Sequence, residues 1–178
     1  MIRQADPSRD AAACAAIYAP YVLEGVASLE VQAPDEREMA KRIERISRTH
    51  AWLVAELDGA IAGYAYSSRH HERAAYRWST DVTVYLDAAF QRRGLGRALY
   101  SELLELARRQ GLYVACAGIT LPNAASVGLH EAMGFTPVGV YRGVGFKHGR
   151  WWDVGWWQLQ LRERSPAGAA PPEPGPPR

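Results

Sequence analysis

Residues 81–97 read DVTVYLDAAFQRRGLGR, and this stretch decides the fold. Its first six residues are mostly β-branched or aromatic, as a strand prefers. Gly94 and Gly96 then lead into an apolar stripe at helical spacing, which ends at Gly111 and consists of Leu95, Ala98, Leu99, Leu103 and Leu106. The stretch therefore predicts a strand, a glycine loop and a helix in succession.

The glycine loop has the features of a phosphate-binding site. Where a strand passes into a helix, glycines let the backbone approach a ligand, and the first unpaired amides of the helix point outward. Arg92, Arg93 and Arg97 add positive charge, which suits a pyrophosphate with a further phosphate beside it. A Walker loop is absent, and the Rossmann pattern lacks its third glycine because Leu99 stands there. For this loop alone, glycines that merely make a turn are the alternative.

Strand and helix patterns alternate outward from the loop. Toward the amino terminus we expect a strand at 2–5, helices at 6–21 and 35–49, and a hairpin of 52–57 and 60–67 around Asp58-Gly59. Toward the carboxyl terminus we expect a strand at 113–119, a helix at 124–133, and strands near 136–146 and 151–161. This order predicts an α/β (α+β) domain whose mixed sheet carries helices on both faces.

Composition sets the limits of this domain. The chain has 178 residues and is 48% hydrophobic, which is enough for one domain with a core of its own, over residues 1–164. Residues 165–178 read SPAGAAPPEPGPPR and hold six of the eleven prolines, with little that can pack. We expect this segment to be a disordered, proline-rich tail.

Charge and special residues exclude several classes of protein. The formal charge of +2, from 21 basic and 19 acidic residues, is too balanced for a nucleic-acid groove. No apolar run reaches the roughly 20 residues of a membrane span, and the first residues lack the apolar run of a secretion signal. Cys14 and Cys116 lie in unlike segments, and the five histidines show no metal-ligand spacing. We expect a cytoplasmic protein with no metal and no nucleic-acid or membrane partner.

Several motifs, in order along the chain, resemble those of one family. Residues 91–96 (QRRGLG) resemble the Q/R-x-x-G-x-G/A signature of the GNAT superfamily of acetyl-CoA-dependent N-acetyltransferases. Residues 121–135 (LPNAASVGLHEAMGF) resemble its Asn-x-x-Ser/Ala helix followed by Gly-Phe. Residues 76–85 (YRWSTDVTVY), 129–132 (LHEA) and 145–155 (GFKHGRWWDVG) are similar to the phosphinothricin and methionine sulfoximine N-acetyltransferases. The resemblance covers residues 2–161.

The resemblance implies a cofactor site in a known type of sheet. The family fold has a mixed sheet of about seven strands and about four helices, with splayed parallel strands that hold acetyl-CoA. The implied cofactor-binding residues are Val84, Tyr85, Leu86, Arg92, Arg93, Gly94, Leu95, Gly96, Arg97 and Asn123. A backbone amide near Leu86 would stabilise the thioester oxygen as it gains charge. Taken alone, Asn123 is equally well explained as a helix N-cap after Pro122.

Direct acetyl transfer requires a base for the amine and an acid for the departing thiolate. Asp81 aligns with a glutamate that the phosphinothricin group presents as general base. Because aspartate is one methylene shorter, proton removal through water, a role in holding the ammonium group, and a merely solvated carboxylate stay open. His130 falls where many GNAT enzymes carry a tyrosine that protonates the sulfur. A histidine that only satisfies its hydrogen bonds is the alternative. Both cysteines resemble small core residues more than a covalent relay.

The substrate is expected to be a small amino-acid-like amine, of the phosphinothricin, methionine sulfoximine or sulfone type. Cations and aromatic rings suit its carboxylate, so the predicted substrate-binding residues are Tyr76, Arg77, Trp78 and Lys147. Glu30, where relatives tend to have a phenylalanine, argues against assuming the herbicide itself. Tryptophans within 151–157 predict a final core strand and a homodimer interface. A non-enzymatic acyl-CoA sensor and a protein N-terminal acetyltransferase are the alternative functions.

Overall fold

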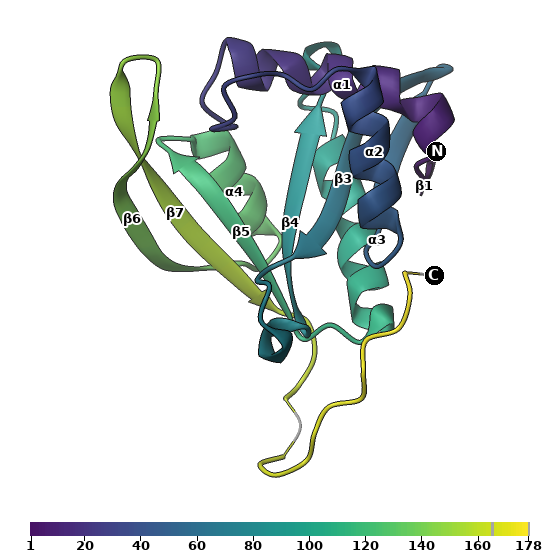
Figure 1. Cartoon of the computed structure of the whole chain (residues 1–178), viewed down its shortest axis with the longest axis vertical. Helices are drawn as coiled ribbons and strands as arrows, with labels where there is room; N and C mark the ends of the chain where they lie inside the picture. Colours follow the sequence, from purple (N-terminus) through teal and green to yellow (C-terminus); the bar gives the residue numbers. More distant parts are fainter. Residues whose placement is uncertain (165, 178) are drawn as a thin grey trace.

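The computed structural model describes residues 1–164 and 166–177, so Ser165 and Arg178, the ends of the predicted tail, lie outside the described residues. Within this range, seven strands form one mixed sheet in the order β1-β2-β3-β4-β5-β7-β6 (Figure 1). The strands are β1 (Ile2–Gln4), β2 (Trp52–Leu57), β3 (Ala60–Arg69), β4 (Ser79–Leu86), β5 (Val114–Leu121), β6 (Thr136–Lys147) and β7 (Arg150–Gln160). The helices are α1 (Pro7–Leu23), α2 (Glu36–Ser47), α3 (Leu95–Gln110) and α4 (Ala124–Ala132), with short 3-10 turns η1 (Ala74–Tyr76) and η2 (Ala88–Phe90).

Local sequence signals explain where these elements begin. The Asp6 carboxylate accepts a hydrogen bond from the Ser8 amide at 2.8 Å and caps α1, whose first residue is Pro7. Asp58 and Gly59 have φ angles of 52° and 79°, the left-handed values that a two-residue hairpin turn requires. The predicted order of elements is confirmed, with boundaries that move by a few residues at most.

Two separate cores cover the two faces of the sheet. On β2, Trp52 and Val54 pack with α1 and α2, whereas Leu53 and Ala55 pack with α3, because successive strand residues point to opposite faces. Leu99 and Leu103 of the predicted α3 stripe are fully buried. Burial of such a side chain contributes about 2 kcal/mol. No helix in the described part of the chain is both long and apolar enough to cross a bilayer.

The centre of the sheet is open where its two parallel strands part. β4 and β5 pair only at Ser79↔Val114, Thr80↔Ala115 and Asp81↔Cys116. Beyond that point β4 continues to Leu86 and β5 to Leu121, and no further pairs join them in the described structure. The Leu86 carbonyl accepts a hydrogen bond from the Tyr21 hydroxyl at 2.6 Å, and the other backbone groups that would have paired are available to a ligand. The splayed strands implied by the resemblance are confirmed.

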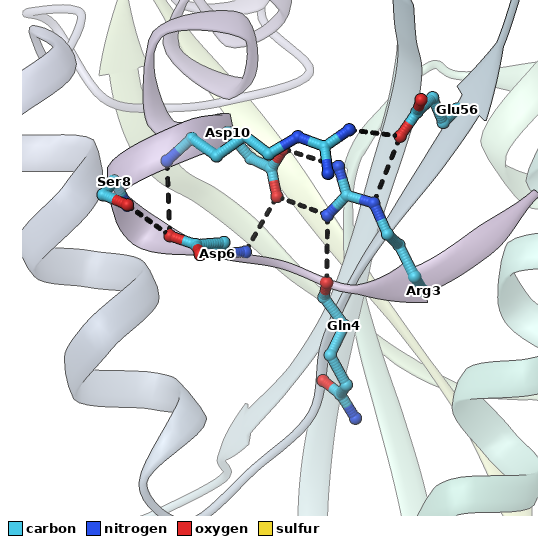
Figure 2. A network of polar contacts seen from close by, with 7 residues as sticks. Arg3, Gln4, Asp6, Ser8, Asp10 and Glu56 are labelled. Atoms are coloured by element: carbon cyan, nitrogen blue, oxygen red, sulfur yellow. Dashed lines mark hydrogen bonds and ion pairs between the residues drawn. The ribbon is translucent and has the colours of Figure 1, made fainter. Parts of the chain in front are cut away.

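A polar network ties the amino terminus to the edge of the sheet (Figure 2). Asp10, which is 1% exposed, accepts two hydrogen bonds from Arg3, at 2.7 and 2.8 Å, and one from the Asp6 amide at 2.8 Å. Glu56 of β2 accepts from Arg3 at 3.2 Å and from Arg9 at 2.9 Å. The network thereby joins β1, α1 and β2.

The proline-rich segment returns along the end of α3 (Figure 1). The Gly175 amide donates to the Gln110 carbonyl at 2.7 Å, and the indole N–H of Trp78 donates to the Pro172 carbonyl at 2.9 Å. Arg77 and Glu173 form an ion pair at 2.6 Å. Residues 166–177 carry no helix or strand. The disorder expected for this segment stays a prediction.

Candidate active site

A cleft of about 460 Å³ opens between the parted strands. Nine of the ten predicted cofactor-binding residues line it, and they come from β4, from the loop before α3 with its first turn, and from the cap of α4. These nine are Val84, Tyr85, Leu86, Arg92, Gly94, Leu95, Gly96, Arg97 and Asn123. The tenth, Arg93, has its guanidinium over the Phe90 ring, 5.4 Å from the ring centre.

The glycine loop forms a cradle at one end of this cleft. Gly94 caps α3 with a φ of 78° and has no side chain to bond the free amides. The first helical hydrogen bond runs from the Ala98 amide to the Gly94 carbonyl, so the amides of residues 95–97 precede it and are free for an anion. A Cβ at Gly96 would lie 3.4 Å from Leu129 and 3.5 Å from Leu86, so a larger side chain would enter the cleft. This geometry fits a diphosphate.

Asn123 has the role of a helix cap. Its side-chain oxygen accepts a hydrogen bond from the Ser126 amide at 3.0 Å. The N-cap interpretation is therefore confirmed. The amide NH₂ of the same side chain remains a donor on a residue that lines the cleft, so both interpretations of Asn123 are compatible.

His130 lies in the wall of the cleft and is only 4% exposed. Its Nδ1 is 2.7 Å from the Ser126 carbonyl oxygen, and its Nε2 is 3.0 Å from the Tyr100 hydroxyl. Because a carbonyl only accepts, these partners assign the proton to Nδ1, and Tyr100 then donates to Nε2. Burial lowers the pKa of His130, although the bond to the Ser126 carbonyl opposes this. The ring is neutral, with both nitrogens partnered.

Asp81 occupies the last paired position before the strands part. Its carboxylate Oδ1 lies 2.6 Å from Nδ1 of His70, a residue that follows the last residue of β3 and that sequence reasoning missed. Burial raises the pKa of Asp81, and the bond from His70 offsets only part of this. The side chain is 29% exposed. No sequence signal pointed to His70, because the register between β3 and β4 is what brings it to Asp81.

Cys116 completes a three-residue cluster with His70 and Asp81. Their ligand-type atoms all lie within 4.8 Å of one another, and such atoms bind transition metals in proteins. The hydrogen bond between His70 and Asp81 already joins two of these atoms. Burial raises the pKa of the Cys116 thiol to about 11, which disfavours the thiolate that a metal requires. The absence of a metal stays a prediction.

Neither thiol is poised for covalent catalysis. Cys14 lies on the buried face of α1, and burial raises its pKa to about 12. With Cys116 also held as a thiol, no described cysteine is an activated nucleophile. The chemistry of the site therefore favours direct transfer to an amine over an acyl-enzyme.

The four predicted substrate-binding residues are dispersed. Tyr76 lies beside His70, with 6.0 Å between ring centres. Arg77 and Trp78 contact the carboxyl-terminal segment. The Lys147 ammonium group is buried and donates to the Ser28 carbonyl at 2.7 Å. Tyr76 is thereby placed beside the hydrogen-bond partner of Asp81. The substrate roles of all four stay predictions.

A second cavity of about 720 Å³ lies on the α1/α2 face of the sheet. Asp81 is not one of its lining residues, but the lining residue Ser68 is paired with Asp81 across β3 and β4. Glu30 lines it too, but Arg42 binds both oxygens of that carboxylate, at 2.7 and 3.0 Å. Burial opposes ionisation of Glu30, yet these bonds hold its pKa below the usual value. Arg42 thus balances the negative charge that argued against an anionic substrate.

Comparisons with known proteins agree with this geometry. A family model described as Acetyltransferase (GNAT) domain matches residues 2–156. The chain is 40% identical over 157 residues to the phosphinothricin N-acetyltransferase of Streptomyces viridochromogenes, covering 88% of this chain and 86% of that one. It is 38% identical over 165 residues to the L-methionine sulfoximine/L-methionine sulfone acetyltransferase of Salmonella typhimurium, covering 92% and 96%. The solved GNAT superfamily phosphinothricin acetyltransferase from Sinorhizobium meliloti, in complex with acetyl-CoA, superposes with a TM-score of 0.90 at 36% identity, covering 97% of this chain and 93% of that one.

Proposed function

This chain belongs to the GNAT acetyltransferase family, and from that premise we propose that the cleft between β4 and β5 is its acetyl-CoA site. The protein is an N-acetyltransferase that transfers the acetyl group of acetyl-CoA directly to the amino group of a small amino-acid-like substrate. Phosphinothricin and methionine sulfoximine, which appear in the names of its relatives, are the first amines to test.

The cradle at the start of α3 is the observation that carries the cofactor site. The amides of residues 95–97 receive the diphosphate, and Arg92 and Arg97 neutralise its charge. When bound, acetyl-CoA supplies the acetyl group as a thioester. The backbone of β4 between Val84 and Leu86 holds the pantetheine arm, because β5 has left that edge unpaired. The Asn123 NH₂ group donates to the same arm.

Asp81 is assigned to the proton removal that frees the amine. Its position at the fork of the strands places a carboxylate on the α1/α2 side of the sheet, beside the larger cavity. That cavity suits an amino-acid-like substrate, because aromatic rings wall it and its four lining arginines (Arg42, Arg45, Arg48 and Arg69) outnumber its three lining carboxylates (Glu30, Glu38 and Glu72). A carboxylate of the substrate would meet these arginines while its ammonium group faces Asp81.

His130 is assigned to protonation of the CoA thiolate as it leaves. Its Nε2 shares the Tyr100 proton, and both rings line the cleft through which the sulfur departs. His130→Ala should lower kcat more than it weakens cofactor binding. Because the ring is buried, a thermal denaturation curve must accompany the kinetics, so that lost packing is separated from lost proton transfer.

A homodimer formed by the β6–β7 hairpin is part of the same proposal. The hairpin exposes Val138, Tyr141, Phe146 and Trp151, each more than half accessible, and β6 is an edge strand. An apolar surface of this kind on an unpaired edge favours a second copy. The expected compartment is the cytoplasm, consistent with two unpaired cysteines.

Release of CoA thiol tests the proposed function. Purified protein is mixed with acetyl-CoA and with phosphinothricin, methionine sulfoximine, methionine sulfone or a panel of amino acids, and free thiol is followed. We expect amine-dependent release with at least one amino-acid-like amine. Gly96→Val should weaken acetyl-CoA binding in calorimetry, whereas Gly128→Val on α4, where a side chain meets nothing within 4 Å, is the matched control. Equal affinities in the two variants would mean that the cradle is misplaced.

A further inference from the structure

His70 directly follows β3 and is the hydrogen-bond partner of Asp81. Its Nδ1 is 2.6 Å from the Asp81 carboxylate, and its side chain is 26% exposed. The Tyr76 and Trp156 rings flank it, each with its centre 6.0 Å from the imidazole centre. The imidazole is therefore held by one hydrogen bond and two aromatic walls, and it still reaches solvent.

The hydrogen-bond partners fix the tautomer of this imidazole. A carboxylate only accepts, so Nδ1 carries the proton and donates it to Asp81. No described residue bonds the Nε2 atom, which leaves its lone pair free. A histidine whose Nδ1–H is held by a partly buried aspartate, with Nε2 free, has the geometry of a general base. His130 differs, because both of its nitrogens have protein partners.

We propose that His70 is the residue that accepts the proton of the substrate ammonium group, and that Asp81 is the positioning residue that orients its imidazole and stabilises the imidazolium. This assignment rests on the proposed function, and it makes the action of Asp81 on the amine indirect. One N–H bond of the ammonium group breaks, and an N–H bond forms at His70 Nε2. The amine lone pair then bonds the acetyl carbon as the C–S bond breaks. The nitrogen then loses a second proton. The sulfur leaves with the C–S bonding pair and takes up one proton, so that one of the two protons lost by the nitrogen is released overall.

The length of the two side chains supports this division of roles. Asp81 is one methylene shorter than the glutamate that it aligns with. The imidazole bonded to it places the basic nitrogen one ring farther from the carboxylate. The aspartate then works through a hydrogen bond at 2.6 Å rather than across a gap. The sequence left open whether Asp81 removes the proton through a water molecule. In this proposal the proton passes to the His70 side chain, and no water is needed.

Charged and aromatic groups from several elements face His70. Asp81 on β4 is its charged partner, Cys116 on β5 is a thiol, and the Tyr76 ring closes the third side. Arg69 and Glu72, on the same segment as His70, form an ion pair with each other at 2.9 Å. Near neutral pH an amine substrate is largely protonated, so it requires a base before it can attack the thioester.

His70→Gln tests the proposal, with His71→Gln as the matched control. Glutamine keeps a donor for Asp81 but removes the base. His71 is exposed, accepts a hydrogen bond from the Arg73 amide and lies beside the Tyr76 ring, with 4.8 Å between ring centres, and no hydrogen bond in the described structure joins it to Asp81. We expect kcat/KM for the amine to fall about 10²-fold or more in His70→Gln. The acetyl-CoA dissociation constant and the melting temperature should stay at the wild-type values. His71→Gln should match the wild type throughout.

The pH profile separates a lost base from a displaced side chain. Without a base, the variant depends on free amine in solution, so its kcat/KM should rise about tenfold per pH unit up to the pKa of the amine. The wild-type profile should level off at a lower pH than the profile of the variant, because the protein supplies the base. A structural role would lower the profile without changing its shape, and that result would overturn the proposal.

A double-mutant cycle provides the second test. If Asp81 acts through His70, the His70→Gln/Asp81→Asn double variant should be about as slow as the slower single variant. Fully additive losses would show independent roles and overturn the assignment. If the wild type binds acetyl-CoA but releases no thiol with any amine, the proposed function itself fails. If the wild type is active and His70→Gln equals it, the inference alone fails.

Discussion

Two aspartates, Asp10 of α1 beside the β1 edge of the sheet and Asp81 of the central strand β4, are each bonded to a nitrogen base. Asp10 is 1% exposed and accepts three hydrogen bonds, two of them from one guanidinium (Figure 2). Asp81 is 29% exposed, and its side chain accepts one hydrogen bond, from the imidazole of His70. Their pKa values move in opposite directions. Burial alone would raise the pKa of Asp10, but the bonds from Arg3 lower it, whereas burial raises the pKa of Asp81 with only His70 opposing.

The difference shows how the same residue type becomes structural or chemical. A buried carboxylate that has a fixed charge and a full set of donors is locked in one protonation state, so it stabilises the fold and does no proton chemistry. A carboxylate with a single titratable partner leaves that partner free to exchange protons. Saturation of the hydrogen bonds, more than burial itself, separates the network of Figure 2 from the His70–Asp81 pair.

Asp81→Asn is expected to have the largest effect and to divide the two aspartates most sharply. Without the carboxylate, the proton of His70 is no longer held on Nδ1, and the charge that stabilises an imidazolium is lost. The kcat/KM for the amine should therefore fall about 10²- to 10⁴-fold. Thiol release under saturating acetyl-CoA measures it. Asp10→Asn, assayed well below its own melting temperature, should keep near wild-type kcat/KM. A comparable loss in both variants would erase the distinction.

Asp10→Asn should produce the next largest effect, in stability instead of rate. The substitution leaves the Arg3 guanidinium, which is 19% exposed, without its main counter-charge, and a broken partly buried pair of this kind costs about 3 kcal/mol. Chemical denaturation at pH 7 measures the free energy of unfolding. Asp81→Asn should unfold at the same denaturant concentration as the wild type or a higher one, because it removes a charge that burial disfavours. A large loss in that variant would make Asp81 a structural residue as well.

The pH dependence of these stabilities should carry opposite signs. The lowered pKa of Asp10 means that its contribution is present above the unfolded value of about 4 and is lost as the pH falls through the folded pKa. The gap between the wild type and Asp10→Asn should therefore narrow toward pH 3. The raised pKa of Asp81 favours folding below about pH 4 and is lost as the pH rises through the folded pKa. Any gain from Asp81→Asn should therefore appear only toward neutral pH, as urea titrations across this range would reveal.

The cofactor half of the site could be predicted from sequence, because it lies within contiguous motifs. The turn at Gly94, the free amides after it and the capping side chain of Asn123 each depend on residues within a few positions. Backbone geometry of this kind follows from local rules about glycine and helix ends. Nine of ten predicted cofactor-binding residues accordingly line one cleft.

The amine half depends on strand register and could not be predicted in the same way. His70 meets Asp81 because Ser68 pairs with Asp81 across two strands, and nothing in the sequence specifies that register. Trp78 was predicted to form part of an aromatic wall of the substrate site, yet its indole N–H donates to the Pro172 carbonyl in the carboxyl-terminal segment. Long-range contacts of this kind decide which polar residues share a site.

Arg9→Ala should have the smallest effect, and it tests whether position in the network matters more than the number of charges. Arg9 is 59% exposed and touches Glu56 at 2.9 Å, but it lies 3.9 Å from Asp10. Solvent screens such a pair, so its removal should cost less than about 1 kcal/mol of unfolding free energy. The matched change near Asp81 is Arg69→Ala, which removes an exposed pair with Glu72 and should likewise cost less than about 1 kcal/mol of unfolding free energy. If Arg9→Ala cost as much as Asp10→Asn, the saturated carboxylate would no longer be the centre of that network, because the peripheral guanidinium would carry an equal share of its stability.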